Sequence, residues 1–381
     1  MSRHLPHRCW AEIDLDALRH NARACRAAAP AGCAVVAIVK AGAYGHGMNH
    51  VAPALRSEVD AFAVANLAEA TELAAVPGCH DRRILLLSPL LPDERAPAIA
   101  AGFEIPVSTR SELDAYLRVA EATGKVAHLH AVADTGMGRM GAASDDFPDL
   151  VAAIRQVETG SGGKTLRLRG IATHLPSADE ETDFTRGQVR DFRALLDRLR
   201  LPDGVDIHLA NSAGVFAYPG EIDFATAIRP GLALYGVSPL PDFQAALRPA
   251  LTWKTRLTLV RDVPAGTTIS YGRTYTAPRP LRIATLAVGY ADGYPRQLSG
   301  RGADVLIRGR RCPVLGRVTM DQVVVDVSDL PDSPIPGDEA VLLGRQGETE
   351  EIPAAEFAEK AGTIPWEILT GIGPRVVRAA V

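Results

Sequence analysis

The sequence has no marked excess of charge of either sign. Its 381 residues include 41 lysines and arginines and 45 aspartates and glutamates, which gives a formal net charge of −4 at pH 7. A chain without a broad basic surface is a poor partner for the phosphates of nucleic acids and for anionic membranes. We therefore expect no nucleic-acid partner and a small molecule as the ligand.

Long apolar runs are absent as well. No run approaches the ~18 residues that a membrane-spanning helix needs. The first residues, MSRHLPHRCWAEIDLD, lack the apolar core of a secretory signal. The sequence therefore predicts a cytoplasmic protein that does not bind a membrane.

Cysteine is scarce and shows no motif. The five cysteines are scattered and include no C-x-x-C pair, which argues against a disulfide framework and against a zinc site. His46 and His50 have the spacing of a helical metal pair, but no acidic residue lies between them and no third ligand is evident. We predict no metal. His128 and His130 share one face of a predicted strand, where packing or hydrogen bonding inside the fold is the simpler role.

Up to about residue 236, short apolar runs alternate with stretches of helical spacing, which is typical of βα units on a parallel sheet. Eight such units over this length predict a closed (β/α)₈ barrel, with an open doubly wound sheet as the alternative. The predicted strands are 34–40, 60–66, 82–90, 104–110, 126–133, 168–175, 206–212 and 226–236.

After Pro239 the pattern changes. Strand-like runs such as LTWKTRLTLV, LRIATLAVGYA and QVVVDVSD follow one another with Gly/Pro turns and almost no helix between them. This predicts a second, mostly β domain. We place the boundary in 240–249 and divide the chain into a barrel domain, 1–240, and a β domain, 241–381.

Polar residues stand where several predicted barrel strands end. In a barrel, the loops that follow the strands form one shared mouth, and functional residues gather there. Lys40 ends the first strand within AIVKAGAYGHG (37–47), and His174 ends the sixth. Asn211 and Ser212 end the seventh strand, and Arg229 lies in the eighth. We expect these side chains to converge.

Lys40 is the most informative of them. An amine whose stem lies in an apolar strand end has its pKa lowered by desolvation, and a neutral amine forms a Schiff base with an aldehyde. Pyridoxal phosphate chemistry needs such a lysine, although an arbitrary strand-end lysine more often extends into water. The segments NSAG (211–214) and RPGL (229–232) supply backbone N–H groups and a hydroxyl for the phosphate. ETGSGGKT (158–165) lacks the first glycine of a Walker loop.

Several segments together resemble bacterial alanine racemase along nearly the whole chain. Their order and spacing make the resemblance specific where a single segment would not be. The segments are WAEIDLDALRHN (10–21), AIVKAGAYGHG (37–47), DTGMGRMG (134–141), GIATHLPSADE (170–180), LANSAG (209–214), AIRPGLALYGVSP (227–239), SYGRTYTA (270–277), VGYADGYPR (288–296) and GRVTMDQ (316–322).

The resemblance implies the barrel and β domains, pyridoxal phosphate as cofactor, and interconversion of L- and D-alanine for the cell wall. Lys40 would hold the cofactor, and Arg229 would face its pyridine nitrogen. Because an arginine does not readily give up a proton, the ring nitrogen should stay unprotonated and the cofactor should be a restrained electron sink. The other implied cofactor residues are Tyr44, His174, Asn211, Ser212, Gly231 and Leu232.

Racemisation removes a proton from one face of the α-carbon and returns one to the other, which is most simply done by two bases. Lys40 would be the first base. The resemblance makes Tyr271 the second, with a pKa that must fall below its usual ~10. It also implies a homodimer in which each site takes Tyr271, Tyr290 and Met320 from the partner. Arg139 would bind the substrate carboxylate or the cofactor phenolate.

The sequence departs from the family pattern at several positions. Val132 stands where a carbamylated lysine commonly orients the arginine of DTGMGR, so a chloride, Asp134 or another acid must take over that role. Trp366 replaces a tyrosine, Thr319 a frequent cysteine, and Gly42 a frequent Asn or Asp. These changes leave the substrate range open: alanine is the first expectation, and serine or a broader set of amino acids is the alternative.

Two other functions fit the sequence less well. Amino-acid decarboxylases of the same two-domain plan typically place a glutamate at the pyridine nitrogen and use a catalytic cysteine, whereas this chain has Arg229 and Tyr271. A non-enzymatic carrier of pyridoxal phosphate would need the barrel alone and would leave the β domain without a purpose.

Overall fold

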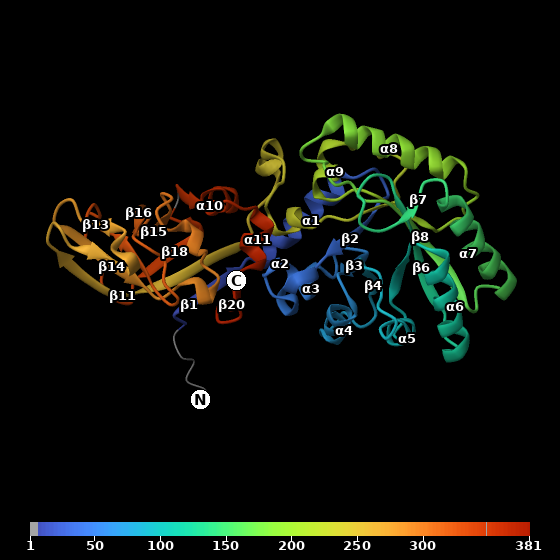
Figure 1. Ribbon diagram of the computed structural model, residues 1–381, viewed down its shortest axis with the longest axis horizontal. Coiled ribbons are helices and arrows are strands. Elements are labelled where there is room, and N and C mark those ends of the chain that lie inside the picture. Colours follow the sequence, from blue (N-terminus) through green and yellow to red (C-terminus); the bar gives the residue numbers. More distant parts are fainter. Residues whose placement is uncertain (1–6, 348) are drawn as a thin grey trace. The chain divides into compact units, whose positions relative to one another are not determined.

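The computed structural model describes residues 7–347 and 349–381, and Figure 1 shows its elements. Contacts between residues divide the chain into two compact units. The barrel unit consists of Asp16–Ala43 and Val51–Arg248. The β unit consists of the N-terminal segment through Leu15, Tyr44–His50 and Pro249–Val381. The sequence-based division after residue 240 stays a prediction.

The barrel unit contains a closed sheet of parallel strands. The strand order is β5-β4-β3-β2-β10-β9-β8-β6, and β5 also pairs with β6, which closes the ring. Closure confirms the predicted barrel and excludes the open sheet. Each strand overlaps one of the predicted runs: β2 (Ala34–Ile38), β3 (Ala61–Val64), β4 (Arg83–Leu86), β5 (Glu104–Val107), β6 (Ala127–Asp134), β8 (Leu166–Ala172), β9 (Asp206–His208) and β10 (Ala227–Ile228).

Helices follow most of these strands, and Figure 1 shows α4 to α8 around the outside of the sheet. Local sequence explains their ends. In α6 the side chains of Thr109 and Glu112 form a capping box, and Gly124 ends the helix at φ 64. The helices are α1 (Leu15–Ala28), α3 (Met48–Leu55), α4 (Leu67–Ala75), α5 (Arg95–Ala100), α6 (Arg110–Thr123), α7 (Phe147–Ser161), α8 (Thr182–Asp197) and α9 (Ser212–Ala217).

The β unit is built on one mixed sheet, which confirms the mostly β character predicted after residue 240. Its order is β19-β18-β15-β16-β17-β14-β11-β1-β20, with an additional β18–β11 pairing. The strands are β1 (Cys9–Ile13), β11 (Leu251–Val263), β14 (Leu281–Leu286), β15 (Asp304–Ile307), β16 (Arg310–Leu315), β17 (Val323–Asp326), β18 (Glu339–Gln346), β19 (Glu350–Ile352) and β20 (Val377–Ala380). A hairpin of β12 (Thr268–Ile269) and β13 (Tyr275–Thr276) and two helices, α10 (Ala354–Ala361) and α11 (Pro365–Thr370), complete it.

Aromatic packing anchors the core of the β unit. The rings of Trp253 and Tyr294 lie 6.1 Å apart, and those of Tyr294 and Phe357 meet edge to face at 5.5 Å. Edge-to-face pairs at such separations stabilise beyond the apolar area that they bury. All five cysteines of the chain are buried and free, as the absence of a cysteine motif predicts.

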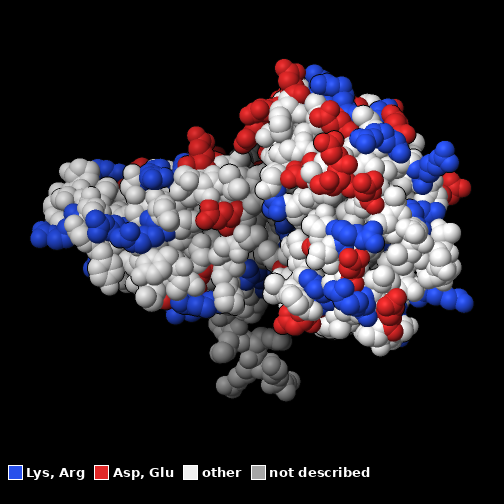
Figure 2. Space-filling view, turned by 45° about the vertical axis from the view of Figure 1, so that its right-hand side comes forward, with Lys and Arg blue, Asp and Glu red and all other residues white. Residues whose placement is uncertain are grey.

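The surface agrees with the balanced charge of the sequence. Figure 2 shows blue Lys and Arg side chains interspersed with red Asp and Glu side chains over the visible face of the barrel unit. No single-sign patch dominates that face. None of the helices in the described part of the chain combines the length and the apolar character that crossing a bilayer requires.

Candidate active site

Lys40 lies two residues after β2, at the start of a left-handed turn. In the element α2 (Lys40–Tyr44), Ala41, Gly42 and Ala43 have φ values of 52, 60 and 56°. L-residues other than glycine enter this region at a cost of roughly 1–2 kcal/mol each. The backbone N–H of Ala41 donates to Glu69 Oε1 at 2.8 Å, and that of Ala43 donates to the carbonyl of Val39 at 2.9 Å. These bonds hold a strained segment next to the lysine.

The surroundings of Lys40 favour its neutral form. Burial lowers the pKa of the Lys40 amine, the positive charge of Arg139 lowers it further, and Glu69 opposes the change only in part. A lysine with a lowered pKa is a better nucleophile and base at neutral pH. The desolvation expected from the sequence is therefore present at this strand end.

Arg229 directly follows β10 and is buried. Its Nη2 donates to the carbonyl of Thr173 at 2.9 Å and lies 3.2 Å from His174 Nδ1, and its Nη1 lies 2.5 Å from His208 Nδ1. Burial, together with the charge of Arg139, lowers the pKa of Arg229 to about 10. The guanidinium therefore stays charged at neutral pH.

His174 is the neutral member of the cluster. Burial lowers the pKa of its ring to about 3, with further contributions from Arg229, Arg139 and Lys40. Because arginine has only donors, His174 Nδ1 must accept from Arg229, which leaves the ring proton on Nε2. Charge effects on their pKa values link Lys40, Arg139, His174 and Arg229, while the convergence of all the predicted side chains on one cofactor stays a prediction.

The loops after β9 and β10 are joined through one hydroxyl. Ser212 Oγ accepts from the backbone N–H of Gly231 at 3.0 Å and from that of Ala233 at 3.2 Å. Asn211 caps α9 by accepting from Gly214 N at 3.0 Å, and its amide donates to the carbonyl of Leu175 at the same distance. Leu232 begins the short 3₁₀ helix η1 (Leu232–Tyr235) beside this hydroxyl. Backbone donors, a hydroxyl and an amide are thereby gathered at the ends of two neighbouring strands.

The loop that carries Arg139 is folded by Asp134. The Asp134 carboxylate accepts from the backbone N–H groups of Gly136, Met137 and Gly138 at 2.9–3.1 Å. Burial tends to raise the pKa of Asp134, but these hydrogen bonds outweigh it and the net pKa is lowered. Asp134 therefore shapes the loop through its backbone, and within the described residues no ion pair joins it to Arg139, whose side chain is exposed.

The remaining predicted site residues belong to the β unit. Tyr271, Met320 and Tyr290 are 74%, 52% and 43% exposed, which is unusual for side chains of their size. The segments that carry them are linked, because the backbone N–H of Tyr290 donates to Thr319 O and Ser270 Oγ donates to Arg317 O. These three side chains form what we call the exposed triad.

Two further residues named in the sequence analysis belong to the β unit. Tyr44 is buried, and burial raises the pKa of its phenol to about 12, so the hydroxyl stays protonated and able to donate. Trp366 lies on α11, which packs closely on the chain next to Tyr44: a Cβ added to Gly45 would lie 2.0 Å from the carbonyl oxygen of Leu369.

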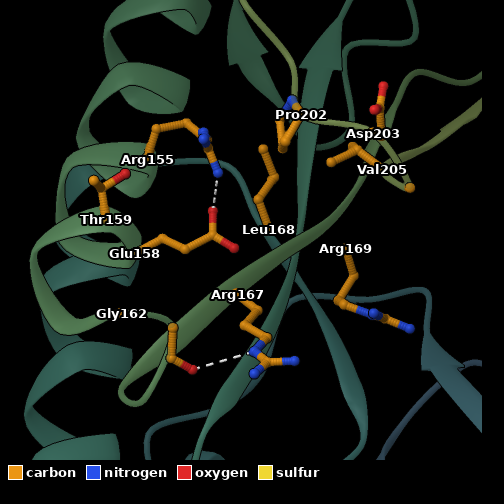
Figure 3. A pocket seen from close by; sticks show the side chains of 12 residues that line it. Arg155, Glu158, Thr159, Gly162, Arg167, Leu168, Arg169, Pro202, Asp203 and Val205 are labelled. Carbon is orange, nitrogen blue, oxygen red and sulfur yellow. Dashed lines mark hydrogen bonds and ion pairs between the residues drawn. The ribbon is translucent and has the colours of Figure 1, made fainter.

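A separate hollow of about 400 Å³ lies at the opposite, amino-terminal end of β8. Arg155, Arg167 and Arg169 project around it, and Arg155 is paired with Glu158 (Figure 3). Arg167 donates from Nε to the carbonyl of Gly163 at 3.2 Å. Because barrel sites form at the carboxyl ends of strands, this hollow is not part of the cluster around Lys40.

The chain matches two known protein families over most of its length. Residues 13–239 match the family described as "Alanine racemase, N-terminal domain", and residues 250–380 match "Alanine racemase, C-terminal domain". The chain belongs to the alanine racemase family.

Its relatives match at nearly full length. An alanine racemase from Methylacidiphilum infernorum is 40% identical over 97% of this chain and 92% of that protein, and one from Symbiobacterium thermophilum is 42% identical over 97% and 96%. The crystal structure of alanine racemase from D-cycloserine-producing Streptomyces lavendulae has a TM-score of 0.89 at 39% identity, covering 99% and 98% of the two chains. That of alanine racemase from Bartonella henselae, described with covalently bound pyridoxal phosphate, has a TM-score of 0.86 at 28% identity, covering 99% and 100%.

Sequence reasoning missed two side chains that shape the site. Glu69 holds the left-handed turn, and its only sequence signal is its position three residues after the helix-capping Asn66. His208 contacts Arg229 from β9, four residues before Ser212. Alternation along the strand could have placed His208 inside the barrel, but nothing in the sequence identifies its partner.

The low pKa of His174 predicts a pH-dependent contribution to stability. A base whose pKa falls on folding binds more protons in the unfolded state than in the folded state. Its contribution to the unfolding free energy is therefore complete above the unfolded-state pKa of 6.5, and it declines as pH falls toward the folded-state pKa of about 3. Between pH 7.5 and 5.5, His174 should account for a loss of about 1 kcal/mol in unfolding free energy. Urea unfolding of the wild type and of His174→Gln at both pH values measures this. Equal pH dependence in the two proteins would contradict the prediction.

Proposed function

We propose that this protein is a pyridoxal phosphate-dependent racemase that interconverts L- and D-alanine in the cytoplasm and supplies D-alanine for peptidoglycan. The observation that carries the proposal is the amine of Lys40: it ends a barrel strand, its pKa is lowered by burial, and it shares a cluster with Arg139, His174 and Arg229 in a chain of the alanine racemase family.

The donor set fits the proposed cofactor. The cluster contains two arginines and a lysine, and Glu69, the acid that affects the Lys40 pKa, accepts from the backbone N–H groups of Ala41 and Ala65 at 2.8 Å. A phosphorylated aldehyde would neutralise such a cluster. Lys40 would bind its aldehyde carbon and Arg229 would face its ring nitrogen. The groups for the phosphate and the ring face would be Tyr44, His174, Asn211, Ser212, Gly231 and Leu232.

The proposed mechanism divides the work between two bases. The bound cofactor supplies an electron sink that acidifies the α-C–H bond of the amino acid. Lys40, whose lowered pKa favours its neutral form, would take or return the proton on the face of D-alanine, and Tyr271 would act on the face of L-alanine. Arg139 binds the substrate carboxylate. Arg229 remains a donor at the ring nitrogen because its pKa of about 10 keeps it protonated, and this limits side reactions.

We propose that the exposed triad completes the site of a partner subunit in a homodimer. Tyr271, Tyr290 and Met320 would otherwise leave large apolar or aromatic side chains in water, at exposures of 43–74%. Burial against a second copy removes that cost, and a twofold dimer presents the same surface on both subunits.

The substrate proposal is alanine first. Thr319 bears little on this choice. Its hydroxyl donates to Gln322 O at 2.7 Å and accepts from Gln322 N at 3.1 Å, so it is used within the turn formed by residues 319–322. Trp366, on the helix that packs beside Tyr44, is the departure that favours the second candidate, a racemase of serine or of a broader set. A racemase assay over a panel of amino acids separates the two.

Removing the amine tests the cofactor proposal. Lys40→Ala should abolish the visible absorption of the protein with pyridoxal phosphate and lower racemase activity by about 10⁴-fold or more, because both the bond and one base are lost. Absorption spectra and a chiral assay measure these effects. Lys164→Ala, at an exposed lysine, is the matched control. A wild type without visible absorption would refute the cofactor proposal.

Tyr271→Phe tests the assignment of the two faces. Loss of the phenol should slow α-proton exchange of L-alanine by about 10²–10⁴-fold and that of D-alanine by less than about tenfold, because Lys40 still serves the second face. Proton exchange in deuterated water, followed by NMR, measures both rates. Tyr275→Phe, on the same hairpin, controls for loss of a nearby hydroxyl. Equal losses from both isomers would count against the two-base assignment.

Subunit mixing tests the shared site. Lys40→Ala and Tyr271→Phe, each inactive in L-to-D conversion, should regain about one quarter of the wild-type activity when co-expressed, because half of random dimers are mixed and each then holds one intact site of two. Sites built within one chain would give no recovery. Purification with two different tags confirms that mixed dimers have formed.

A further inference from the structure

A continuous chain of buried polar side chains runs through the barrel interior to Arg229. Glu104 on β5, His130 on β6, His208 on β9 and Arg229 after β10 are each 2–7% exposed. Glu104 Oε2 lies 2.8 Å from His130 Nε2, His130 Nδ1 lies 2.8 Å from His208 Nε2, and His208 Nδ1 lies 2.5 Å from Arg229 Nη1. Every link is a hydrogen-bond distance between side chains from different strands.

The chemistry of the two end groups fixes the direction in which protons are donated along this hydrogen-bonded chain of side chains. Arginine has only N–H donors, so His208 Nδ1 must accept from Arg229. His208 therefore carries its proton on Nε2 and donates to His130 Nδ1. His130 in turn carries its proton on Nε2 and donates to Glu104. Both rings are then neutral and each has a single tautomer. Burial, with the charge of Arg229 adding to it, lowers the pKa of His208 well below its ordinary value, which agrees with a neutral ring.

The far end of the chain is held as an anion. Arg83 donates to Glu104 from Nε at 2.8 Å and from Nη2 at 3.0 Å, and Arg83 Nη2 also reaches Asp206 at 2.5 Å. Burial tends to raise the pKa of Glu104, but hydrogen bonds from His130 and Arg83 outweigh it, so its pKa lies far below the ordinary value. The chain therefore links a buried cation to a buried carboxylate through two neutral rings.

Gly170 provides the space that the two rings occupy. It lies on β8 between β6 and β9, opposite His130 in the strand register. A Cβ at this position would lie 2.2 Å from His130 Nδ1 and 3.1 Å from His208 Nε2. No larger side chain fits without moving His130. The ring pair thus depends on a glycine in a neighbouring strand.

We propose that Glu104, His130 and His208 are positioning residues that fix the orientation and the positive charge of Arg229 toward its ligand. They give the guanidinium the stabilisation of a carboxylate without placing an acid in contact with it. An acid in contact with Arg229 would lie near the ring nitrogen and offer it a proton, whereas a neutral imidazole acceptor with its proton turned away does not. This role deepens the proposed function and rests on Arg229 facing the cofactor.

The first test examines the tautomers directly. In the holoenzyme labelled with ¹⁵N-histidine, solid-state NMR should find His130 and His208 neutral, each with its proton on Nε2. Assignment uses His130→Asn and His208→Asn. A protonated ring, or a proton on Nδ1 in either ring, would overturn the relay. This result does not depend on racemase activity, so it stands or falls separately from the proposed function.

The second test measures whether changes in the Glu104–His130–His208 chain alter the visible absorption of the bound cofactor and the racemase activity. Glu104→Gln and Gly170→Ala, which alter the chain without touching Arg229, should each shift the visible band of the bound cofactor and lower kcat by about 10–100-fold with little change in KM, the range typical of residues that orient a site residue from behind. His128→Gln, two residues before His130 on the same strand and outside the chain, is the matched control and should leave both values unchanged.

Folding is checked by circular dichroism and thermal unfolding. If Glu104→Gln does not fold because Arg83 loses its partner, the visible band and kcat are measured in Gly170→Ala and His130→Asn instead. An unchanged band and kcat in the folded variants would overturn the proposal. Equal effects of His128→Gln would also overturn it, because they would show a general response to changes in the barrel interior.

Discussion

Burial of Lys40 and Arg229 close to the positive charge of Arg139 is the constraint on which the rest of the site depends. Burial lowers the pKa values of both groups, and the charge of Arg139 lowers them further. These effects favour the neutral form of the Lys40 amine, whereas the pKa of Arg229, about 10, leaves its guanidinium charged at neutral pH. The fold thereby favours the neutral form of an amine close to the charged Arg229, and an anionic ligand would relieve the repulsion.

Local hydrogen bonds to the backbone hold the segments that carry Lys40 and Arg139 in place. The left-handed turn after Lys40 places Ala41 and Ala43 in a region that L-residues avoid, and Glu69 holds it through the backbone. Asp134 similarly folds the loop of Arg139 through three backbone N–H groups. Within the described residues, neither carboxylate forms an ion pair with these cations, although Glu69 partly offsets the lowering of the Lys40 pKa. Acids near the site thus serve the geometry of the chain, and the positive potential is preserved for the ligand.

The sequence predicted the barrel well because its signal is local. Each buried strand is a short apolar run, and Lys40, His174, Ser212 and Arg229 follow such runs, so barrel geometry alone predicts that they converge. The partners that sequence reasoning missed act at long range. The sequence suggested packing or hydrogen bonding inside the barrel for His130, but it gave no sign of its partners Glu104 and His208, because these hydrogen bonds exist only when the barrel closes through the β5–β6 pairing. The conformation of the turn at Ala41 was equally hidden, because alanine gives no sign of a positive φ.

The contrast between Arg229 and the exposed triad explains how one chain can combine a fixed site with an open one. Arg229 is buried and reaches a carboxylate through two rings, so its position is set by the barrel itself. Tyr271 stands on a 3₁₀ turn with most of its surface exposed, and nothing in the described part of its own unit restricts the phenol. In the proposed mechanism the second base approaches the α-carbon from the face opposite Lys40, and Tyr271 would meet this requirement from a partner subunit. The second base would then depend on assembly, whereas the first would depend only on folding.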